Sequence, residues 1–159
     1  MQNNESITFI PVVRFSSVVV LDESFRVLLV CEQKPGIEGL WNTPGGGDEP
    51  GELPVQAAKR ELYEETGLKN LEPQFLETFL WHGDRGDILM CHVFVLQVDS
   101  SVQISPVFTE EILEVRWFKK LEFDRMYENQ KIRTELTKIF IERALRYAQT
   151  QAVQSGEPK

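Results

Sequence analysis

The stretch that decides this fold runs from Gly46 to Leu68 and reads GGDEPGELPVQAAKRELYEETGL. Pro54 suits the first turn of a helix, where its missing N–H costs nothing, and Gly67 suits the left-handed position after the last turn. The sequence therefore predicts a helix over residues 54–66. Leu53 precedes this helix, so the helix start lacks a capping side chain that is worth about 1 kcal/mol.

Three glutamates of this helix share one face. Glu61, Glu64 and Glu65 stand at positions i, i+3 and i+4, which puts their carboxylates on one side within about a turn. Like charges at this spacing repel each other, so a bound cation is expected to compensate them. Mg²⁺ and Mn²⁺ prefer carboxylate oxygens, and Mg²⁺ completes its shell with water and substrate phosphates. The opposite face is apolar and is expected to pack against a sheet through Val55, Ala58 and Leu62.

The same stretch carries a family resemblance. It matches the pattern G-x5-E-x7-R-E-U-x-E-E-x-G-U, with U an aliphatic residue, at every fixed position, and Pro44 and Gly45 extend the match. This pattern is the signature of the Nudix hydrolases, which the chain resembles. The resemblance implies an α/β fold, an α/β/α sandwich with a mixed β-sheet, and a metal-dependent hydrolase. The alternative, a merely solvated acidic helix, is disfavoured by the full pattern.

The resemblance also implies roles for single residues. Glu61, Glu64 and Glu65 would hold Mg²⁺, with Mn²⁺ as a substitute. Gly45, Gly46 and Gly47 are expected to form a flexible turn, and Gly45 would bring its backbone close to the ion or the substrate. Glu64 is the first choice for the base that takes a proton from the attacking water.

Other acidic and basic residues allow two interpretations each. Arg60 is either a surface cation or a group that orients a metal-binding carboxylate, and we favour the second. Glu52 is either an acid favoured by the helix dipole or a group near the metals. Glu110 or Glu111 stands where some family members have an acidic residue that serves as a further metal ligand or as the base. Glu111 is the second choice of base after Glu64.

Three residues outside the helix are candidate substrate contacts. Trp41 either stacks on a nucleobase or packs beneath the glycines, and packing is favoured. Lys34 can replace the Arg that some members place at the end of the second strand, where this chain has Glu32 and Gln33. Asn129 resembles the position where MutT-type members use an Asn on a purine edge.

Composition predicts one compact domain. The 159 residues are 42% hydrophobic, and we expect a single domain over 1–150 and a disordered tail over 151–159. A net charge of −8 disfavours stable nucleic-acid binding. Cys31 and Cys91 lie in apolar runs, which predicts core thiols in a reducing compartment. Neither a signal peptide nor a membrane span is predicted, so the cytoplasm is the default location.

Strands alternate with two helices in the predicted layout. The strand over 88–98 is apolar on both faces and should therefore be central. The other strands are expected over 10–21, 26–32, 71–81 and 114–118, with a short extended piece over 41–44 and a closing amphipathic helix over 130–149.

The implied reaction is metal-assisted substitution at phosphorus in a small nucleoside diphosphate linked to a group X. Markers that the family uses for ADP-ribose, dinucleoside polyphosphates and coenzyme A are absent. The leading hypothesis is a MutT-like pyrophosphohydrolase of (deoxy)nucleoside triphosphates, with oxidised purine nucleotides included. A nucleotide-sugar or ADP-ribose hydrolase is the alternative within the family, and a non-catalytic nucleotide-binding regulator is the alternative of another class. Many members form homodimers, and no segment of this sequence commits to an interface.

Overall fold

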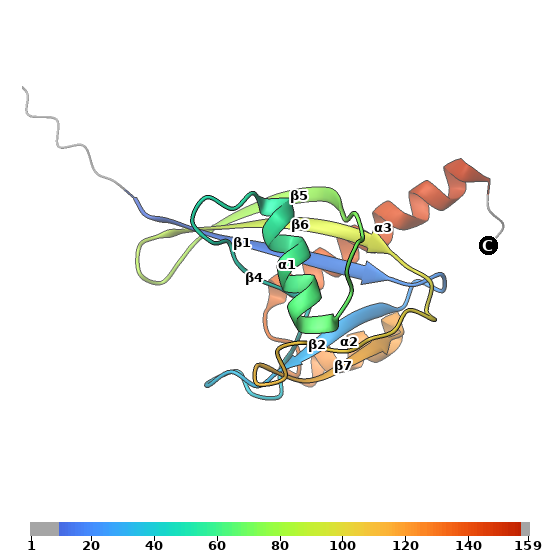
Figure 1. Cartoon of the computed structure of the whole chain (residues 1–159), viewed down its shortest axis with the longest axis horizontal. Coiled ribbons are helices and arrows are strands. Elements are labelled where there is room, and N and C mark those ends of the chain that lie inside the picture. Colours follow the sequence, from blue (N-terminus) through green and yellow to red (C-terminus); the bar gives the residue numbers. More distant parts are fainter. Residues whose placement is uncertain (1–9, 157–159) are drawn as a thin grey trace, which may run out of the picture.

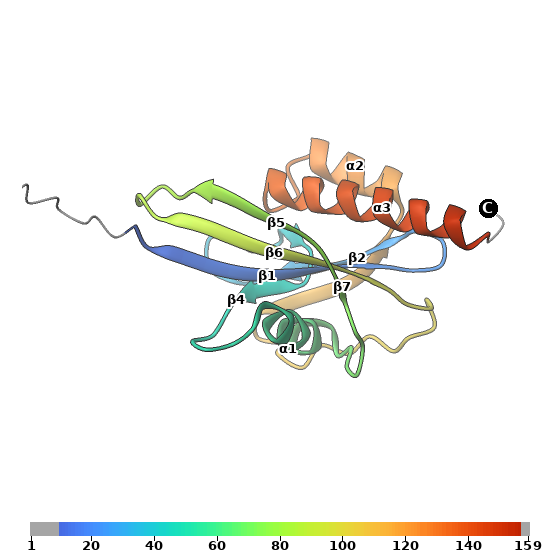
Figure 2. The same cartoon turned by 90° about the horizontal axis from the view of Figure 1, so that it is seen from above.

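The chain folds into alternating strands and helices. The computed structural model describes residues 10–156. Its strands are β1 (Val12–Leu21), β2 (Val27–Glu32), β3 (Trp41–Asn42), β4 (Gly45–Gly47), β5 (Gln74–His82), β6 (Ile88–Gln97) and β7 (Ile112–Phe118). Its helices are α1 (Pro54–Thr66), α2 (Lys120–Glu128) and α3 (Glu135–Ser155). The strands form one mixed sheet (Figure 1), with α1 on one face and α2 and α3 on the other (Figure 2). The expected α/β/α sandwich is confirmed.

The strand order is β3-β2-β1-β6-β5, with β4 paired to β1 and β7 paired to β2. β1 runs parallel to β6 along its whole length and antiparallel to β2. β5 pairs with the other edge of β6, so β6 has a partner on both sides, and its residues Val93–Leu96 are buried. A strand that is paired on both edges and covered on both faces is apolar throughout. The central position expected for 88–98 is therefore confirmed.

Two hydrophobic cores lie on the two faces of the sheet. Successive side chains of a strand point to opposite faces, and β1 shows this alternation directly. Val19 and Leu21 pack into the core that includes residues of α2 and α3, whereas Val18 and Val20 pack into the core that includes residues of α1. The uninterrupted valines of β1 thus hold both helical layers, which sets the position of α1 relative to α3.

Helix α1 has the predicted bounds. Its N-cap residue Leu53 makes no side-chain capping bond, as expected, but Gln56 Oε1 accepts the Leu53 N–H at 2.9 Å. Gly67 ends the helix with φ 79°, and a Cβ at this position would collide with the carbonyl of Ser105. Ala58 and Leu62 are buried against the sheet. Local signals alone therefore define this helix and the direction of its glutamate face.

The three glycines before α1 differ from the prediction. They form the short strand β4 rather than a flexible turn, and they pair antiparallel with Phe15–Ser17 of β1. A Cβ at Gly45 would lie 2.5 Å from the Ser16 carbonyl oxygen, and one at Gly46 would collide with the Glu61 carboxylate. Glycine is therefore needed at positions 45 and 46, because β1 lies against the first and α1 against the second.

The C-terminal part also differs from the prediction, because an additional helix, α2, precedes the single helix that is expected over 130–149. Helix α2 has nine residues and buries only Phe123, which is too weak a pattern to predict from the sequence. Helix α3 begins later, after Thr134, whose Oγ1 accepts the Thr137 N–H at 3.3 Å. It continues to Ser155, so the tail expected from residue 151 is helical up to that point. Residues 157–159 lie outside the described part of the chain.

Replacing Phe123 by Ala is expected to lower the free energy of unfolding by about 3–5 kcal/mol. The side chain is 0% exposed and anchors α2 in the core shared with α3, so its removal leaves a cavity. Urea denaturation followed by circular dichroism measures this change. Leu121→Ala is the matched control, because Leu121 belongs to the same helix but is 62% exposed, and we expect a change of about 0.5 kcal/mol or less. Equal losses in the two variants would contradict this assignment of the core.

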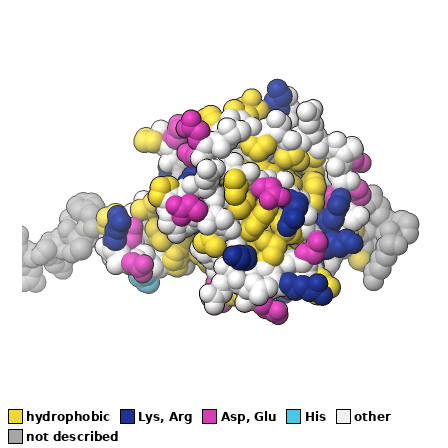
Figure 3. All heavy atoms as spheres, turned by 90° about the horizontal axis from the view of Figure 1, so that it is seen from below, with side chains coloured by type: hydrophobic (Ala, Val, Ile, Leu, Met, Phe, Trp, Pro, Cys, Tyr) yellow, Lys and Arg dark blue, Asp and Glu magenta, His cyan; other side chains and the backbone are white. Residues whose placement is uncertain are grey.

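The surface carries hydrophobic side chains as well as charges. The face in Figure 3 shows hydrophobic side chains across its centre and several Lys and Arg side chains toward its right-hand side. Large hydrophobic residues that are exposed in this chain include Val107, Phe108, Leu113 and Leu121. Exposed apolar patches mark candidate contact surfaces, and a homodimer stays a prediction. Among the helices of residues 10–156, none combines the length and the apolar character needed to cross a membrane.

Candidate active site

The glutamate face of α1 points toward strand β4. Glu65 is 3% exposed, and its Oε2 accepts the Gly45 N–H at 2.9 Å. The Glu61 carboxylate lies against Gly46, and the side chains of Glu61 and Glu64 are 12% and 20% exposed. The three glutamates thus share the inner side of the helix, as their spacing predicts, rather than a solvated face.

Arg60 joins these carboxylates to the rest of the site. Its Nη1 donates to Glu61 Oε1 at 2.7 Å and to Glu64 Oε2 at 3.2 Å. Its Nε and Nη2 donate to the two oxygens of Glu52 at 3.0 Å each, and Nη2 also donates to the Gly47 carbonyl at 2.9 Å. The forked guanidinium therefore holds Glu52, two α1 glutamates and β4 in one network. This geometry favours the orienting role of Arg60 and places Glu52 beside it.

Burial shifts the charge balance of the site. Desolvation raises the pKa of Glu65 to about 8, although the Gly45 N–H and Lys34 act in the opposite direction. Desolvation and the neighbouring Glu61 raise the pKa of Glu64, which Arg60 partly opposes. Glu65 is thus a buried carboxylate whose negative charge is only partly compensated by the protein.

These residues fit a divalent cation. Within residues 10–156, no three carboxylate, imidazole or thiol side chains already converge as a metal site, because Arg60 occupies Glu61 and Glu64 while Glu65 turns to Gly45. A buried carboxylate that retains a raised pKa gains stability when a cation binds to it. The donor set is all oxygen, which is the set that Mg²⁺ and Mn²⁺ prefer. The residues that would hold the ion are Glu61, Glu64 and Glu65.

A cavity of about 410 Å³ opens beside strand β4. Gly45, Gly46 and Gly47 form part of its wall, so the glycines separate the cavity from the glutamate face of α1. Its apolar walls come from Phe15, Trp81, Leu89, Cys91, Leu136 and Phe140, and its polar walls from Ser16, Ser17, Lys34, Asn42, Thr43, Arg133, Thr134 and Thr137. A larger hollow of about 860 Å³ lies between the β1–β2 turn and α3, away from α1.

The predicted substrate contacts lie in different places. Lys34 lines the cavity. Trp41 is 8% exposed and packs edge-on against Phe118 with ring centroids 4.8 Å apart, which is the packing alternative. Asn129 is exposed at the end of α2, where its Nδ2 donates to the Arg125 carbonyl at 2.8 Å. Neither Trp41 nor Asn129 lines the cavity.

Glu111 is connected to the cavity by an ion pair with Lys34, which lines it. The Lys34 Nζ is 2.8 Å from Glu111 Oε2, and the Gln33 N–H donates to the Glu111 carbonyl at 2.8 Å. The Glu111 side chain is 51% exposed, whereas Glu64 is enclosed. Glu110 is exposed in the same loop. The geometry therefore keeps Glu64 as the first choice of base and Glu111 as the reserve.

Two polar residues of the cavity escape sequence reasoning. Asn42 lies next to the predicted Trp41, and its Oδ1 accepts the Thr137 hydroxyl at 2.8 Å. Arg133 lies in the connection between α2 and α3, and its Nη1 donates to Glu32 Oε1 at 2.7 Å. Both depend on contacts between residues far apart in the chain, so no local pattern identifies them. The one available signal is that Asn42 lies three residues before Gly45, the first of the three glycines.

Comparisons with known proteins bear on the family of this chain. A match to the NUDIX domain family covers residues 12–138. The chain is 36% identical over 103 residues to 8-oxo-dGDP phosphatase NUDT18 of Homo sapiens, across 64% of this chain and 31% of that protein. It is 35% identical over 92 residues to an RNA pyrophosphohydrolase of Bartonella clarridgeiae, across 57% of this chain and 53% of that protein. The matched part therefore spans about a third to a half of these two relatives.

A solved structure extends the comparison to the fold. A NUDIX hydrolase from Nitrosomonas europaea superposes with a TM-score of 0.65 and 28% sequence identity, across 84% of this chain and 87% of that one. The chain therefore combines a family match over most of its length with a sheet between two helical layers. The glutamate face of α1 lies beside β4 in this fold. The chain belongs to the Nudix hydrolase family.

Proposed function

We propose that this protein is a divalent-metal-dependent hydrolase that cleaves a phosphoanhydride bond of a nucleoside diphosphate derivative. The observation that carries the proposal is the shared β4 strand. Glu61 and Glu65 meet it from α1, while the 410 Å³ cavity opens beside it. A substrate whose base lies in the cavity would therefore extend its phosphates past β4 toward the carboxylates of α1.

The chain supplies binding, orientation and proton transfer. A divalent ion held by Glu61, Glu64 and Glu65 would neutralise phosphate oxygens and acidify an attacking water. Glu64 accepts the proton of that water, and its raised pKa brings this carboxylate closer to the neutral range in which a general base is effective. Arg60 keeps Glu61 and Glu64 in place, and Glu65 is itself shielded from bulk water.

The cavity suits a nucleobase. Aromatic and aliphatic side chains dominate one part of its wall, including Phe15, Trp81 and Phe140, and such surfaces bury the faces of a planar ring. Asn42 Oδ1 already accepts from the Thr137 hydroxyl and from the Thr43 N–H. Its amide N–H groups are left to donate to acceptors on the edge of a base. Asn42 is therefore the proposed base contact.

For the substrate we propose a (deoxy)nucleoside triphosphate, with oxidised purine nucleotides included. Two relatives support a nucleotide with free phosphates, since one is named an 8-oxo-dGDP phosphatase and the other an RNA pyrophosphohydrolase. The net charge of −8 favours a small nucleotide over a long nucleic acid. Mg²⁺ is the proposed ion, and Mn²⁺ is expected to replace it.

A hydrolysis screen tests this proposal. Triphosphates, diphosphates, nucleotide sugars, ADP-ribose and dinucleoside polyphosphates are incubated with Mg²⁺ or Mn²⁺, and the products are identified. Release of pyrophosphate and a nucleoside monophosphate from a triphosphate is the expected result. Cleavage confined to nucleotide sugars or ADP-ribose would reject the triphosphate assignment. Tight nucleotide binding without any metal-dependent product would reject the enzyme in favour of a regulator.

A further inference from the structure

Arg133 is fixed to the sheet at its backbone. The Arg133 N–H donates to the Trp41 carbonyl at 2.9 Å, and the Trp41 N–H donates to the Lys131 carbonyl at 2.8 Å. Ile132 forms a parallel bridge with Trp41 between these two bonds. The connection between α2 and α3 is therefore held against β3 like a short strand. This pairing gives the predicted residue Trp41 a structural role that depends on its backbone.

The Arg133 side chain is held as well. Its Nη1 donates to Glu32 Oε1 at 2.7 Å, and the Glu32 side chain is 2% exposed while that of Arg133 is 37% exposed. The second oxygen of Glu32, Oε2, is buried and has no hydrogen-bond partner among the described residues. A buried carboxylate with only one hydrogen-bonded oxygen contributes little to the stability of the fold, and an apolar side chain in its place often stabilises a core better. The presence of a glutamate at this buried position is therefore better explained by its role in positioning the Arg133 guanidinium.

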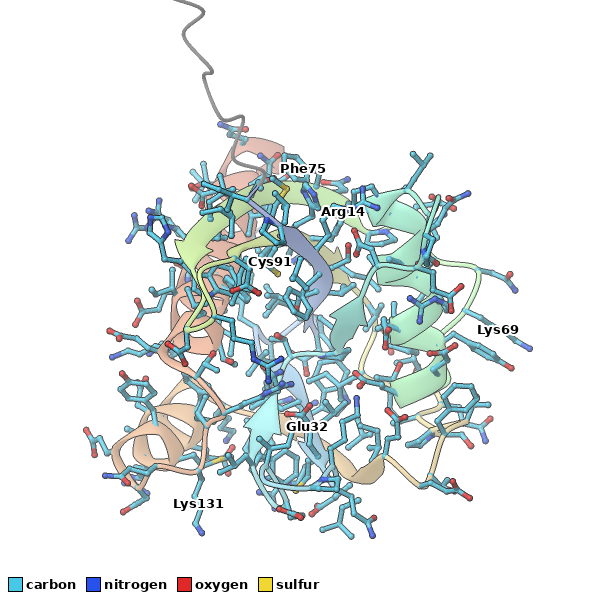
Figure 4. The ribbon with its side chains drawn as sticks, turned by 90° about the vertical axis from the view of Figure 1, so that its left-hand side faces the viewer. Arg14, Glu32, Lys69, Phe75, Cys91 and Lys131 are labelled. Carbon is cyan, nitrogen blue, oxygen red and sulfur yellow. The ribbon has the colours of Figure 1, made fainter. Side chains whose placement is uncertain are left out.

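In the part of the chain that the structure describes, Arg133 and Lys34 are the two basic residues that line the cavity. Both attract the charge of Glu32. Thr134 lines the cavity as the N-cap residue of α3, where the helix dipole favours an anion. Lys34 also attracts the charge of Glu65, so this side of the cavity adjoins the proposed metal-binding carboxylates. Figure 4 shows Glu32 in the middle of this view, between the helical layers.

We propose that Arg133, positioned by Glu32 and assisted by Lys34, binds the free terminal phosphate of the substrate. This inference rests on the proposed hydrolase function and narrows its substrate class. A terminal phosphate carries a charge of about −1.5 to −2 at pH 7, whereas a phosphate capped by a sugar carries about −1. A guanidinium binds two phosphate oxygens with parallel hydrogen bonds. The site therefore selects nucleotides with an uncapped terminal phosphate over nucleotide sugars and ADP-ribose.

The test compares two ligands in two variants. Arg133→Gln removes the guanidinium, and Lys131→Gln is the matched control, because Lys131 belongs to the same connection but projects away from the molecule (Figure 4). The measured quantities are the KM of a nucleoside triphosphate and the inhibition constant of the corresponding nucleotide sugar. We expect Arg133→Gln to raise the KM about 10–100-fold and to change the inhibition constant by less than about 3-fold. Lys131→Gln should leave both constants near those of the wild type.

Positioning by Glu32 has its own readout. Glu32→Gln keeps the shape of the side chain but loses the ion pair, so the KM of the triphosphate should rise while kcat stays near the wild-type value. Arg133→Lys keeps the charge without the fork and should restore only part of the affinity. Equal changes in the KM and in the inhibition constant, or an unchanged KM in Arg133→Gln, would overturn the inference. Circular dichroism of each variant shows that the fold is retained.

A second measurement separates this inference from the proposed function. Binding of inorganic tripolyphosphate is measured by calorimetry with no divalent ion and no nucleotide. Arg133→Gln should weaken this binding about 10-fold or more relative to the wild type and to Lys131→Gln. A wild-type protein that binds tripolyphosphate through Arg133 but cleaves no triphosphate would reject the proposed function alone. Equal binding by all three proteins would reject the role of Arg133 alone.

Discussion

Replacing Glu64 or Glu65 by Gln is expected to lower the turnover number by about 10²–10⁴-fold while the fold is retained. Both substitutions keep the size of the side chain and remove one negative charge. Glu64 would lose its capacity to accept a proton, and Glu65 would lose the charge that a cation needs. The effect should appear mainly in kcat, because the cavity that is proposed to seat the base is untouched.

The stability of these variants distinguishes a catalytic loss from a folding defect. The folded protein raises the pKa of Glu65 to about 8, above its ordinary value of 4.5, so the metal-free protein loses stability as the pH rises between these two values. Gln has no charge to bury, so Glu65→Gln should be at least as stable as the metal-free wild type at pH 8. Such a substitution, which stabilises the fold but lowers activity, is an example of the trade-off between stability and activity at active sites. Urea denaturation at pH 5 and pH 8 measures the difference.

Two control variants make the assignment of the base specific. Glu72→Gln removes a carboxylate whose side chain is 82% exposed and pairs with Lys59, so it should leave turnover near the wild-type value. Glu111→Gln tests the reserve base, which pairs with Lys34, and it should reduce turnover far less than Glu64→Gln. A larger loss in Glu111→Gln would transfer the base to Glu111. Near-normal turnover in both Glu64→Gln and Glu65→Gln would contradict the whole site.

Replacing Arg60 by Gln is expected to lower metal affinity or kcat/KM by about 10–100-fold. One guanidinium bonds Glu52, Glu61, Glu64 and the Gly47 carbonyl, so its loss frees two glutamates and one anchor of β4 together. The remaining carboxylates would repel each other more strongly without the cation between them. Titration with Mn²⁺ followed by activity assays separates a lower affinity for the ion from a slower reaction.

Lys59→Gln is the matched control for Arg60. Lys59 is the preceding residue of α1, but its Nζ pairs with the exposed Glu72 rather than with the glutamates of the site. Its loss should leave Mn²⁺ affinity unchanged. Arg60→Lys should remain impaired, because a point charge cannot form the forked bonds to Glu52 and to the α1 glutamates. Full activity in Arg60→Lys would show that charge alone is required.

Prediction from the sequence worked where structure depends on neighbouring residues. Helix α1 has the predicted bounds because Pro54 and Gly67 act within one turn of its ends, and the strand over 88–98 is central because both of its faces are apolar. Helix α2 was beyond reach because one buried side chain, Phe123, makes no periodic pattern. Gly45–Gly47 form a strand rather than a turn because β1 supplies partners that lie far away in the chain.

The same distinction applies to the site. Spacing along one helix was enough to bring Glu61, Glu64 and Glu65 to one face with Arg60 beside them. The same residues indicated the family and the type of reaction. Only the tertiary structure brought Arg133 to Glu32 across 101 positions and left Trp41 in the core and Asn129 outside the cavity. The physical reason is the distance along the chain between the residues that interact. Helical geometry acts within four residues, whereas the substrate cavity is built from segments that meet only when the sheet and α3 are assembled.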